Sequence, residues 1–284
     1  MNLPKRLKKS LLTAATSAAI LASGAANATL TLSVVDSHGG GGFGSYFGLA
    51  FDGSNLWYST GSTFQKVDQN AAGMPFIGPA YSAPVWSAMA FDGTNLALVS
   101  GKTIYYRSPV DGSAQGTATL IGGPGGSLID GFDIEAGKAY WSPDVSSVEQ
   151  FDYGTKQWDN QILPSAGGFS GVERVTVGAN SFLMVVNDAT SPRKLCRTTL
   201  TGSFTVADDC ATLPNSRYED LAFDGRYLYA ADYYGGRIDK IDIGVQGGGS
   251  IFQPPGAAVP EPASLALMGL GLAGLAAVRR RKTA

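Results

Sequence analysis

GLAFDGSNLWY, at residues 48–58, is the stretch that decides the fold, because variants of it return four times along the chain. The variants are AMAFDGTNLAL from Ala88, GFDIEAGKAYW from Gly131, RVTVGANSFLM from Arg174 and DLAFDGRYLYA from Asp220. Their central apolar residues are separated by 40, 43, 43 and 46 residues, and are Phe51, Phe91, Ile134, Val177 and Phe223. A strand-rich unit that repeats about every 40–45 residues is typical of a β-propeller with one four-stranded blade per unit.

Each unit carries signals for four strands. A short apolar stretch meets Asp-Gly or a related pair and continues as a second β-rich stretch, which indicates a hairpin. A third stretch alternates as a half-exposed strand does, and fainter fourth strands are expected at residues 75–81, 117–123, 160–165 and 204–210. The chain is therefore predicted to be all-β, a single β-propeller of about five four-stranded blades. A β-sandwich or jelly roll is the main alternative, but it does not explain a phrase repeated in phase.

The fifth unit lacks a fourth strand of its own, because the sequence after Ile243 becomes rich in glycine. At the other end of the propeller region, TLTLSVVD from Thr29 to Asp36 has no unit of its own. We expect this N-terminal strand to lie beside Gly236–Ile243, complete the last blade and close the ring. The predicted propeller thus spans residues 29–243.

Charge is distributed unevenly along the chain, whose net charge is −2. Eight of the 21 basic residues lie at the two ends, and the part between them carries 13 basic and 22 acidic residues. Such an acidic domain repels phosphate backbones, so nucleic acid is not an expected partner.

Residues 1–28 have the pattern of a secretory signal peptide. The basic stretch MNLPKRLKK is followed by the uncharged stretch Leu11–Gly24 and then by Ala26-Asn27-Ala28. An amphipathic helix of the domain is the alternative, but the uncharged stretch has no polar face. We therefore expect export by the general secretion machinery and cleavage by signal peptidase after Ala28.

Export would place the two cysteines, Cys196 and Cys210, in an oxidising compartment. They flank the turn Thr201-Gly202-Ser203 on the expected third and fourth strands of the fourth unit, so a disulfide is expected. Two separate buried thiols are the alternative. Zinc is not expected, because two cysteines and the one histidine, His38, do not supply four ligands.

Residues 259–284 form a second targeting segment. Pro260-Glu261-Pro262 is held extended by its prolines, Ala263–Val278 is apolar, and Arg279-Arg280-Arg281 follows. The 16 apolar residues would make a helix about 24 Å long, against a hydrocarbon layer of about 30 Å. We expect a short transmembrane helix whose arginines stay in the cytoplasm. Residues 244–258 are expected to be a flexible Gly/Pro linker.

This tail resembles the PEP-CTERM sorting signal, through Pro260-Glu261-Pro262, the short apolar stretch and Arg279-Arg280-Arg281 in that order. The resemblance implies that exosortase, a membrane protease-transpeptidase, removes the tail. It also implies a place at the cell surface or outside the cell, often alongside extracellular polysaccharide and biofilm. An anchor that is never cut is the alternative. More weakly, the AFDG phrases resemble units of NHL-like and sugar-lactonase-like β-propellers.

Polar residues stand near the start of the expected innermost strands. Four residues before the central apolar positions are Phe47, Ser87, Asp130, Glu173 and Glu219, with Arg174 and Asp220 one step further on. In a propeller these positions converge at one mouth of the axial channel. Asp130, Glu173, Glu219 and Asp220 are the candidate ligands of calcium or of a sugar, with Arg174 balancing their charge. A solvated, salt-bridged rim is the alternative.

The remaining motifs do not indicate catalysis. Asp52-Gly53-Ser54-Asn55 and Asp92-Gly93-Thr94-Asn95 have the spacing of turns and lack the further carboxylates of a calcium loop. His38 lies in a glycine run, where we expect a solvated loop. No catalytic residue is predicted. The expected function is a non-catalytic binding or structural module, and a propeller-type hydrolase or lactonase with a calcium site at the channel mouth is the alternative.

Overall fold

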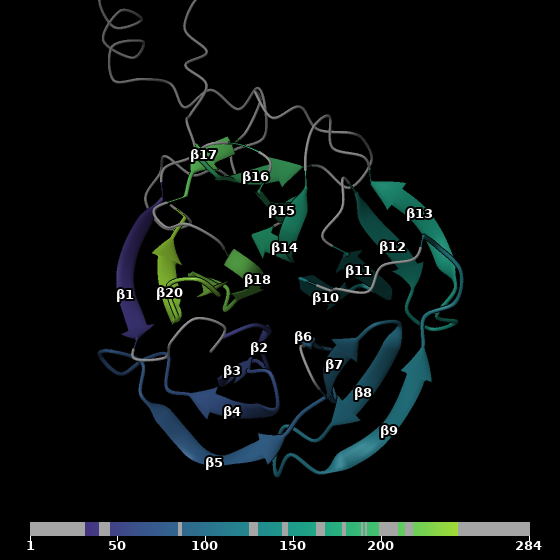
Figure 1. Ribbon diagram of the computed structural model, residues 1–284, viewed down its shortest axis with the longest axis horizontal. Coiled ribbons are helices and arrows are strands. Elements are labelled where there is room, and N and C mark those ends of the chain that lie inside the picture. The colour runs from purple at the N-terminus through teal and green to yellow at the C-terminus, as the bar shows by residue number, and fades with distance from the viewer. Residues whose placement is uncertain are drawn as a thin grey trace, which may run out of the picture. The chain divides into compact units, whose positions relative to one another are not determined.

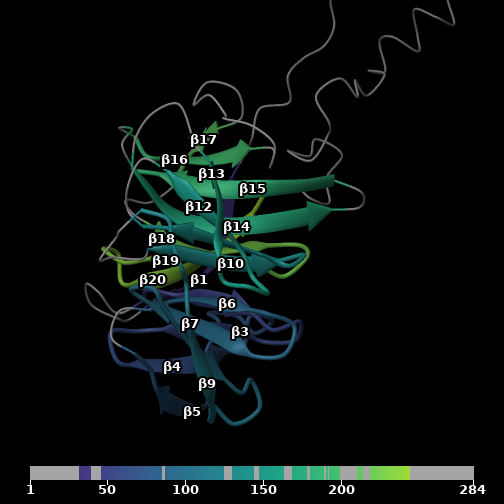
Figure 2. The same ribbon diagram turned by 90° about the vertical axis from the view of Figure 1, so that its right-hand side faces the viewer.

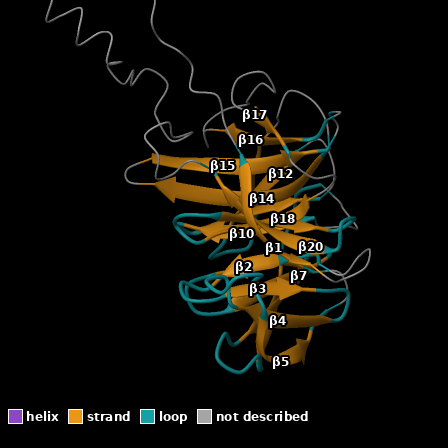
Figure 3. Ribbon diagram, turned by 90° about the vertical axis from the view of Figure 1, so that its left-hand side faces the viewer, coloured by secondary structure: helices purple, strands orange, loops and turns teal. Residues whose placement is uncertain are grey.

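The computed structural model describes residues 32–39, 46–84, 87–124, 130–143, 147–162, 168–177, 180–188, 190, 192–198, 210–213 and 218–243. Within these ranges the chain forms five four-stranded antiparallel sheets around a central axis (Figure 1). The prediction of a five-bladed β-propeller is confirmed. Figure 3 shows that the described elements are strands joined by loops and turns.

Each blade contributes one strand to each of four concentric layers. The innermost strands, of blades 1 to 5 in turn, are β2 (Leu49–Phe51), β6 (Ala88–Phe91), β10 (Gly131–Glu135), β14 (Phe169–Val177) and β18 (Tyr218–Phe223). The second strands are β3 (Leu56–Ser59), β7 (Leu96–Ser100), β11 (Lys138–Ser142), β15 (Asn180–Asn187) and β19 (Leu228–Asp232). The third are β4 (Thr63–Val67), β8 (Thr103–Arg107), β12 (Val148–Asp152), β16 (Lys194–Thr198) and β20 (Arg237–Asp242). The outermost are β5 (Phe76–Ser82), β9 (Ala114–Thr119), β13 (Trp158–Ile162), β17 (Cys210–Thr212) and β1 (Ser33–Gly39).

The N-terminal strand closes the ring. β1 pairs antiparallel with β20, from Ser33 opposite Asp242 to Gly39 opposite Arg237. The predicted closure of the last blade is therefore confirmed. Among the described residues this strand begins at Ser33 and continues past Asp36, whereas residues 29–31 lie outside them.

β1 also fastens blade 5 to blade 1. Asp36 Oδ2 accepts a hydrogen bond from the amide of Gly73 at 3.0 Å, and the rings of His38 and Phe76 lie 4.1 Å apart. The expectation that His38 lies in a solvated loop is wrong, because the strand continues through it and pairs it with Ile238.

The hydrophobic core, in the described part of the chain, consists of five clusters, one at each interface between neighbouring blades. Trp57 of blade 1 packs with Leu98 of blade 2, for example. The cluster that contains Leu49 and Tyr229 joins blade 1 to blade 5. Each blade therefore buries both faces against its neighbours, which is why the sheets are stable only as a ring.

Three blades share one turn between their first and second strands. Asp52 Oδ1 accepts from the amides of Ser54 and Asn55 at 2.8 and 2.7 Å, and Asp92 and Asp224 cap the corresponding turns in the same way. The glycine that follows each aspartate has φ near +90°, a conformation that strains residues with a Cβ. This geometry agrees with the prediction that the Asp-Gly pairs form turns.

The two cysteines join the outer strands of blade 4. Cys196 of β16 lies opposite Cys210 of β17, and a disulfide links them with 4.1 Å between their Cα atoms. Their sequence separation is 14 residues, and closing a loop of that size contributes roughly 3 kcal/mol in the chain-entropy account. The bond holds the short strand β17 in its blade.

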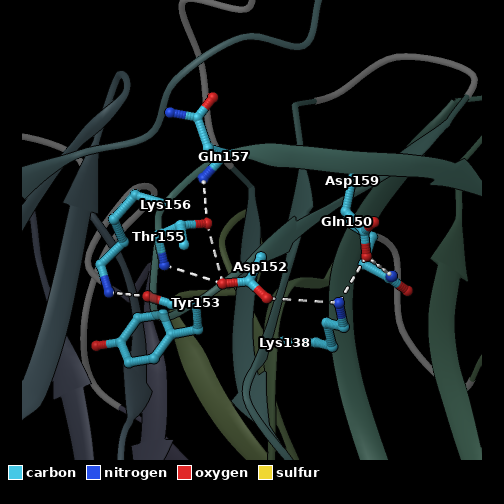
Figure 4. A network of polar contacts seen from close by, with 8 residues as sticks. All are labelled: Lys138, Gln150, Asp152, Tyr153, Thr155, Lys156, Gln157 and Asp159. Atoms are coloured by element: carbon cyan, nitrogen blue, oxygen red, sulfur yellow. Dashed lines mark hydrogen bonds and ion pairs between the residues drawn. The ribbon is translucent and has the colours of Figure 1, made fainter.

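Blade 3 carries an exposed polar network across its second, third and fourth strands (Figure 4). Lys138 Nζ lies 2.7 Å from Asp159 Oδ2 and 3.8 Å from Asp152 Oδ2. The amide and hydroxyl of Thr155 donate to Asp152 Oδ1 at 2.9 and 3.0 Å. Exposed pairs of this kind contribute little to stability, because water solvates the separated charges well.

Candidate functional site

A buried carboxylate on the axis ties four blades together. Asp220 of β18 is fully buried, and both of its oxygens accept backbone hydrogen bonds. Oδ2 accepts from the amides of Leu49 and Met89 at 3.0 and 3.1 Å, and Oδ1 accepts from Phe132 and Leu221 at 3.3 and 2.9 Å. These amides belong to β2, β6, β10 and β18, the innermost strands of blades 1, 2, 3 and 5.

Glycines let the innermost strands of neighbouring blades approach closely around the axis. A Cβ added at Gly131 would lie 2.5 Å from the amide nitrogen of Val172, and one at Gly171 would lie 3.3 Å from the Asp220 backbone. Burial raises the pKa of Asp220, while the four amides favour its ionised form. Since both oxygens are occupied by the backbone, we infer that Asp220 is a structural cross-link across the axis.

Two more carboxyls lie one level further along the innermost strands. Asp133 of β10 and Glu173 of β14 occupy equivalent positions in adjacent blades, where the other three blades have Ala50, Ala90 and Ala222. Asp133 Oδ2 accepts from the amide of Arg174 at 2.8 Å, and Glu173 Oε1 accepts from the amide of Phe223 at 2.9 Å. Each carboxyl therefore bonds the innermost strand of the next blade.

These groups line a pocket of about 240 Å³ at this end of the axis. Blades 3 and 4 supply its polar wall, which includes Asp133, Glu135, Glu173, Arg174 and Thr176. Blades 1, 2 and 5 supply its apolar wall, which includes Leu49, Phe51, Met89, Phe91 and Phe223. β14 and β15, the long pair on the polar side, are seen from the side in Figure 2.

Arg174 is paired within the pocket wall. Its Nε lies 3.0 Å from Glu135 Oε2 and 2.8 Å from Ser181 Oγ. Thr176 Oγ1 donates to Glu135 Oε1 at 2.9 Å. Since Glu135 balances Arg174, the charges of Asp133 and Glu173 have no further cation among the pocket-lining residues.

Both Asp133 and Glu173 hold a proton more tightly than an ordinary carboxylate. Burial, supported by repulsion from Glu135, raises the pKa of Asp133 to about 7. Burial, together with the nearby charges of Asp133 and Asp220, raises the pKa of Glu173 well above its ordinary value. Near neutral pH the pocket can therefore present carboxyls that both donate and accept hydrogen bonds.

Two backbone amides add to the donors of the pocket. Asp52 and Asn55 form a hydrogen-bonded pair at 3.1 Å, and Asp92 and Asn95 form another at 3.0 Å. Because hydrogen-bonded and non-bonded positions alternate in an antiparallel ladder, the preceding amides, of Phe51 and Phe91, face the axis. The equivalent amides of Arg174 and Phe223 donate to Asp133 and Glu173, which belong to the preceding blades. Blades 5 and 1, which precede the blades of Phe51 and Phe91, have alanine at the carboxyl position.

The structure divides the predicted channel-mouth residues into separate groups. Glu173 and Arg174 line the pocket. Asp130 lies just before β10, and Glu219 lies near the start of β18. Both are buried, 3% and 2% exposed, and the level of Asp220 separates them from the pocket. Among the described residues, no group of three or more His, Cys, Asp or Glu side chains is placed to hold a metal ion.

The division arises from a difference in strand length. The β14–β15 hairpin is longer than the other hairpins, since its pairing continues to Val177 opposite Asn180. The residue of β14 that is equivalent to Phe223 is therefore Arg174 and not Val177. Counting four residues back from Val177 selects Glu173, which lies three places further along its strand than Asp130 and Glu219 lie along theirs. Counting from Arg174 would have placed Glu173 with the pocket and not with Asp130.

Sequence analysis missed two pocket residues, Asp133 and Glu135. A signal was present: in the repeated phrase, Asp133 stands where three other units have alanine, at Ala50, Ala90 and Ala222. A charged residue in place of a small apolar one, inside an otherwise uniform repeat, marks a position with a different role.

The expected targeting residues lie outside the described ranges. They are the signal peptide at residues 1–28, the linker, the membrane helix Ala263–Val278 and the sorting residues Pro260, Glu261, Pro262, Arg279, Arg280 and Arg281. In the part of the chain that is described, no helix is long and apolar enough to cross a membrane.

Comparison with known families decides what the tail is. Residues 258–282 match the model of the PEP-CTERM protein-sorting motif. The chain carries a PEP-CTERM sorting motif. The chain is accordingly an exported, exosortase-sorted protein whose body is a β-propeller. No curated protein matches the chain.

Solved structures resemble the propeller of this chain. A glutaminyl cyclase of Myxococcus xanthus is 12% identical with a TM-score of 0.55, covering 75% of this chain and 97% of that one. This likeness shows a shared fold alone. A hydrazine synthase of Kuenenia stuttgartiensis is 18% identical with a TM-score of 0.43, covering 66% of this chain and 55% of that one. A mitotic checkpoint complex chain is 12% identical with a TM-score of 0.41, covering 69% and 60%.

Proposed function

We propose that the protein is a non-catalytic binding module that recognises a sugar unit of extracellular polysaccharide at the cell surface or in the biofilm matrix. The observation that carries this proposal is the axial pocket, with a polar wall from blades 3 and 4 facing an apolar wall from blades 1, 2 and 5. A pyranose ring has the same division, with hydroxyl groups at its edge and C–H groups on its faces.

The pocket chemistry suits hydroxyl groups. Asp133 and Glu173 can accept from hydroxyls and, when protonated, donate to them, and the amides of Phe51 and Phe91 supply further donors. Drug-sized ligands occupy pockets of roughly 300–1,000 Å³. The smaller pocket here, of about 240 Å³, suits one sugar ring or a chain end.

The sorting route sets where this binding takes place. In the proposed route, signal peptidase cuts after Ala28, the propeller folds outside the inner membrane, and the helix Ala263–Val278 holds it there. Exosortase then cuts the chain near Pro260-Glu261-Pro262, so the mature body spans residues 29–243 with the linker 244–258. The PEP-CTERM match supports the exosortase step.

Binding to purified host exopolysaccharide, and to its component sugars, tests the proposal by calorimetry. Glu173→Gln keeps an acceptor for the amide of Phe223 but replaces the second carboxyl oxygen, which can accept from a ligand hydroxyl, with an amide nitrogen that only donates. We expect it to weaken binding about tenfold or more. Val110→Ser, on an 81% exposed residue outside the pocket, is the control. Equal affinity of Glu173→Gln and the parent chain would contradict a binding role for the pocket, provided that both melt at similar temperatures.

A propeller-type hydrolase or lactonase is the second candidate. Asp133 favours it, because a carboxyl with a pKa of about 7 inside a pocket has the proton affinity of a general base. Calcium is not part of this candidate unless added calcium raises the melting temperature. Turnover on a panel of lactones and glycosides that disappears in Asp133→Asn would establish the enzyme in place of the binding module.

A further inference from the structure

The lining of the axial pocket has more carboxyls than cations. It includes the carboxyls of Asp133, Glu135 and Glu173 and one cation, Arg174. Arg174 Nε lies 3.0 Å from Glu135 Oε2, so this pair balances itself and two carboxyls are left without a counter-ion in the lining. The wall from blades 1, 2 and 5 contributes no titratable side chain. A ligand that complements this pocket therefore brings a positive charge of its own.

Asp133 and Glu173 are placed so that one cation can lie beside both. They occupy equivalent positions on the neighbouring strands β10 and β14. Burial and then the charge of Asp133 raise the pKa of Glu173, so the two carboxyls are close enough to interact. Asp133 is 8% exposed and accepts from the amides of Ile134 and Arg174, which supply hydrogen bonds but no net charge. Glu173 uses Oε1 for the amide of Phe223, so among the described residues its Oε2 is left for a ligand.

An ammonium group suits this pair better than a metal ion does. Calcium takes about six to eight oxygen ligands, and the described ranges contain no group of three or more His, Cys, Asp or Glu side chains placed to hold a metal ion. An ammonium group donates hydrogen bonds in a few directions and is carried on a carbon skeleton. That skeleton can contact the apolar wall, which includes Phe51, Phe91 and Phe223. The two walls together therefore fit a cation with an apolar body.

We propose that the sugar unit taken by this pocket is a hexosamine with an unacetylated amino group, whose ammonium lies between Asp133 and Glu173 while one face of the ring packs on the apolar wall. The inference rests on the proposed sugar-binding function and names the substrate class of that site. An ammonium beside the two carboxyls favours their ionised forms. An acetylated amine offers no such charge, and a uronic acid brings a further carboxylate toward them. The pocket therefore selects among sugar units by charge.

Calorimetry with a matched set of small ligands measures this selection. The sugars are glucose, glucosamine, N-acetylglucosamine and glucuronic acid, and n-butylamine carries the ammonium without the ring. The measurements are made at about pH 7, which is below the pKa range of amines. We expect glucosamine to bind about tenfold or more tightly than glucose. N-acetylglucosamine should bind no more tightly than glucose, and glucuronic acid and n-butylamine should bind more weakly than glucosamine.

Two variants locate the charge that is responsible. Glu173→Gln replaces a carboxyl of the pocket with a group that cannot ionise, and Asp159→Asn does the same to an exposed carboxylate of blade 3, outside the pocket. The readout is the ratio of the glucosamine affinity to the glucose affinity, which does not depend on how far a variant weakens sugar binding as a whole. We expect this ratio to fall about fivefold or more in Glu173→Gln and to stay unchanged in Asp159→Asn.

The outcomes separate the inference from the proposal beneath it. If glucose binds as tightly as glucosamine, or if the ratio is unchanged in Glu173→Gln, the inference is overturned and the sugar site stands. If n-butylamine binds as tightly as glucosamine and glucose does not bind, the sugar ring is overturned as the occupant in both proposals. If none of the four sugars binds, the sugar site and the inference fail together.

Discussion

Asp220→Ala is expected to lower the free energy of unfolding by about 4–8 kcal/mol, because it removes the acceptor of four buried amides that each cost about 1–3 kcal/mol when unpaired. The amides belong to four different blades, so the loss affects the whole ring. For a domain of about 200 residues this corresponds to a fall in melting temperature of roughly 10–25 °C, measured by circular dichroism or calorimetry.

Asp159→Ala is the matched control, since it removes an exposed carboxylate that also bonds to several groups. We expect it to change the melting temperature little, because its partners are solvated when it is absent. The melting temperature of Asp220→Asn is expected to lie between those of the two alanine variants. Its side-chain oxygen still accepts from two backbone amides, but its NH2 group faces the other two, which are also donors. A variant Asp220→Ala as stable as Asp159→Ala would show that the axial carboxylate does not hold the ring together.

Stability is expected to fall as the pH rises from 5 to 8. Below about pH 4, Asp133 is protonated in both the folded and the unfolded chain. Between about pH 4 and 7 the folded chain keeps this proton and the unfolded chain has lost it, so the contribution is lost as the pH rises through the folded pKa of about 7. The raised pKa of Glu173 acts in the same direction.

The expected loss from Asp133 is up to about 4 kcal/mol between pH 4 and 7, and about 3 kcal/mol of it falls between pH 5 and 8, at about 1.4 kcal/mol per pH unit below the folded pKa. The measurement is the melting temperature at pH 5 and pH 8 for the parent chain and for Asp133→Asn. The parent chain should melt at a lower temperature at pH 8, and the variant should show a smaller change. A parent chain that gains stability at pH 8 would mean that Asp133 is ionised in the folded protein near its ordinary pKa.

The fold could be predicted because each blade needs the same local chemistry. An apolar strand, a tight turn and a second strand recur along the chain, and three of the turns are Asp-Gly turns with a positive φ, so the sequence repeats visibly. Closure by the N-terminal strand was also predictable, since a blade with three strands and an unassigned strand together make four. The fourth strand of blade 4 was harder, because only Cys210–Thr212 pairs among its described residues.

The site was less predictable because it depends on register and on contacts between blades. The extra length of β14 and β15 shifts the equivalence of Glu173 by three residues, and repeat spacing alone does not reveal such a shift. Nor does the sequence distinguish Asp220 from Glu173. Asp220 lies where four backbone amides converge and is structural, whereas Glu173 lies one level further along the axis and lines the pocket.

The mass of the mature protein purified from its native host tests the proposed sorting route most directly. We propose that the body is exported and that the tail is a temporary anchor. We therefore expect a chain that starts at Thr29 and lacks Ala263 to Ala284, apart from any group that exosortase adds. A mature chain that retains Arg279, Arg280 and Arg281, with its propeller in the cytoplasm, would contradict this route.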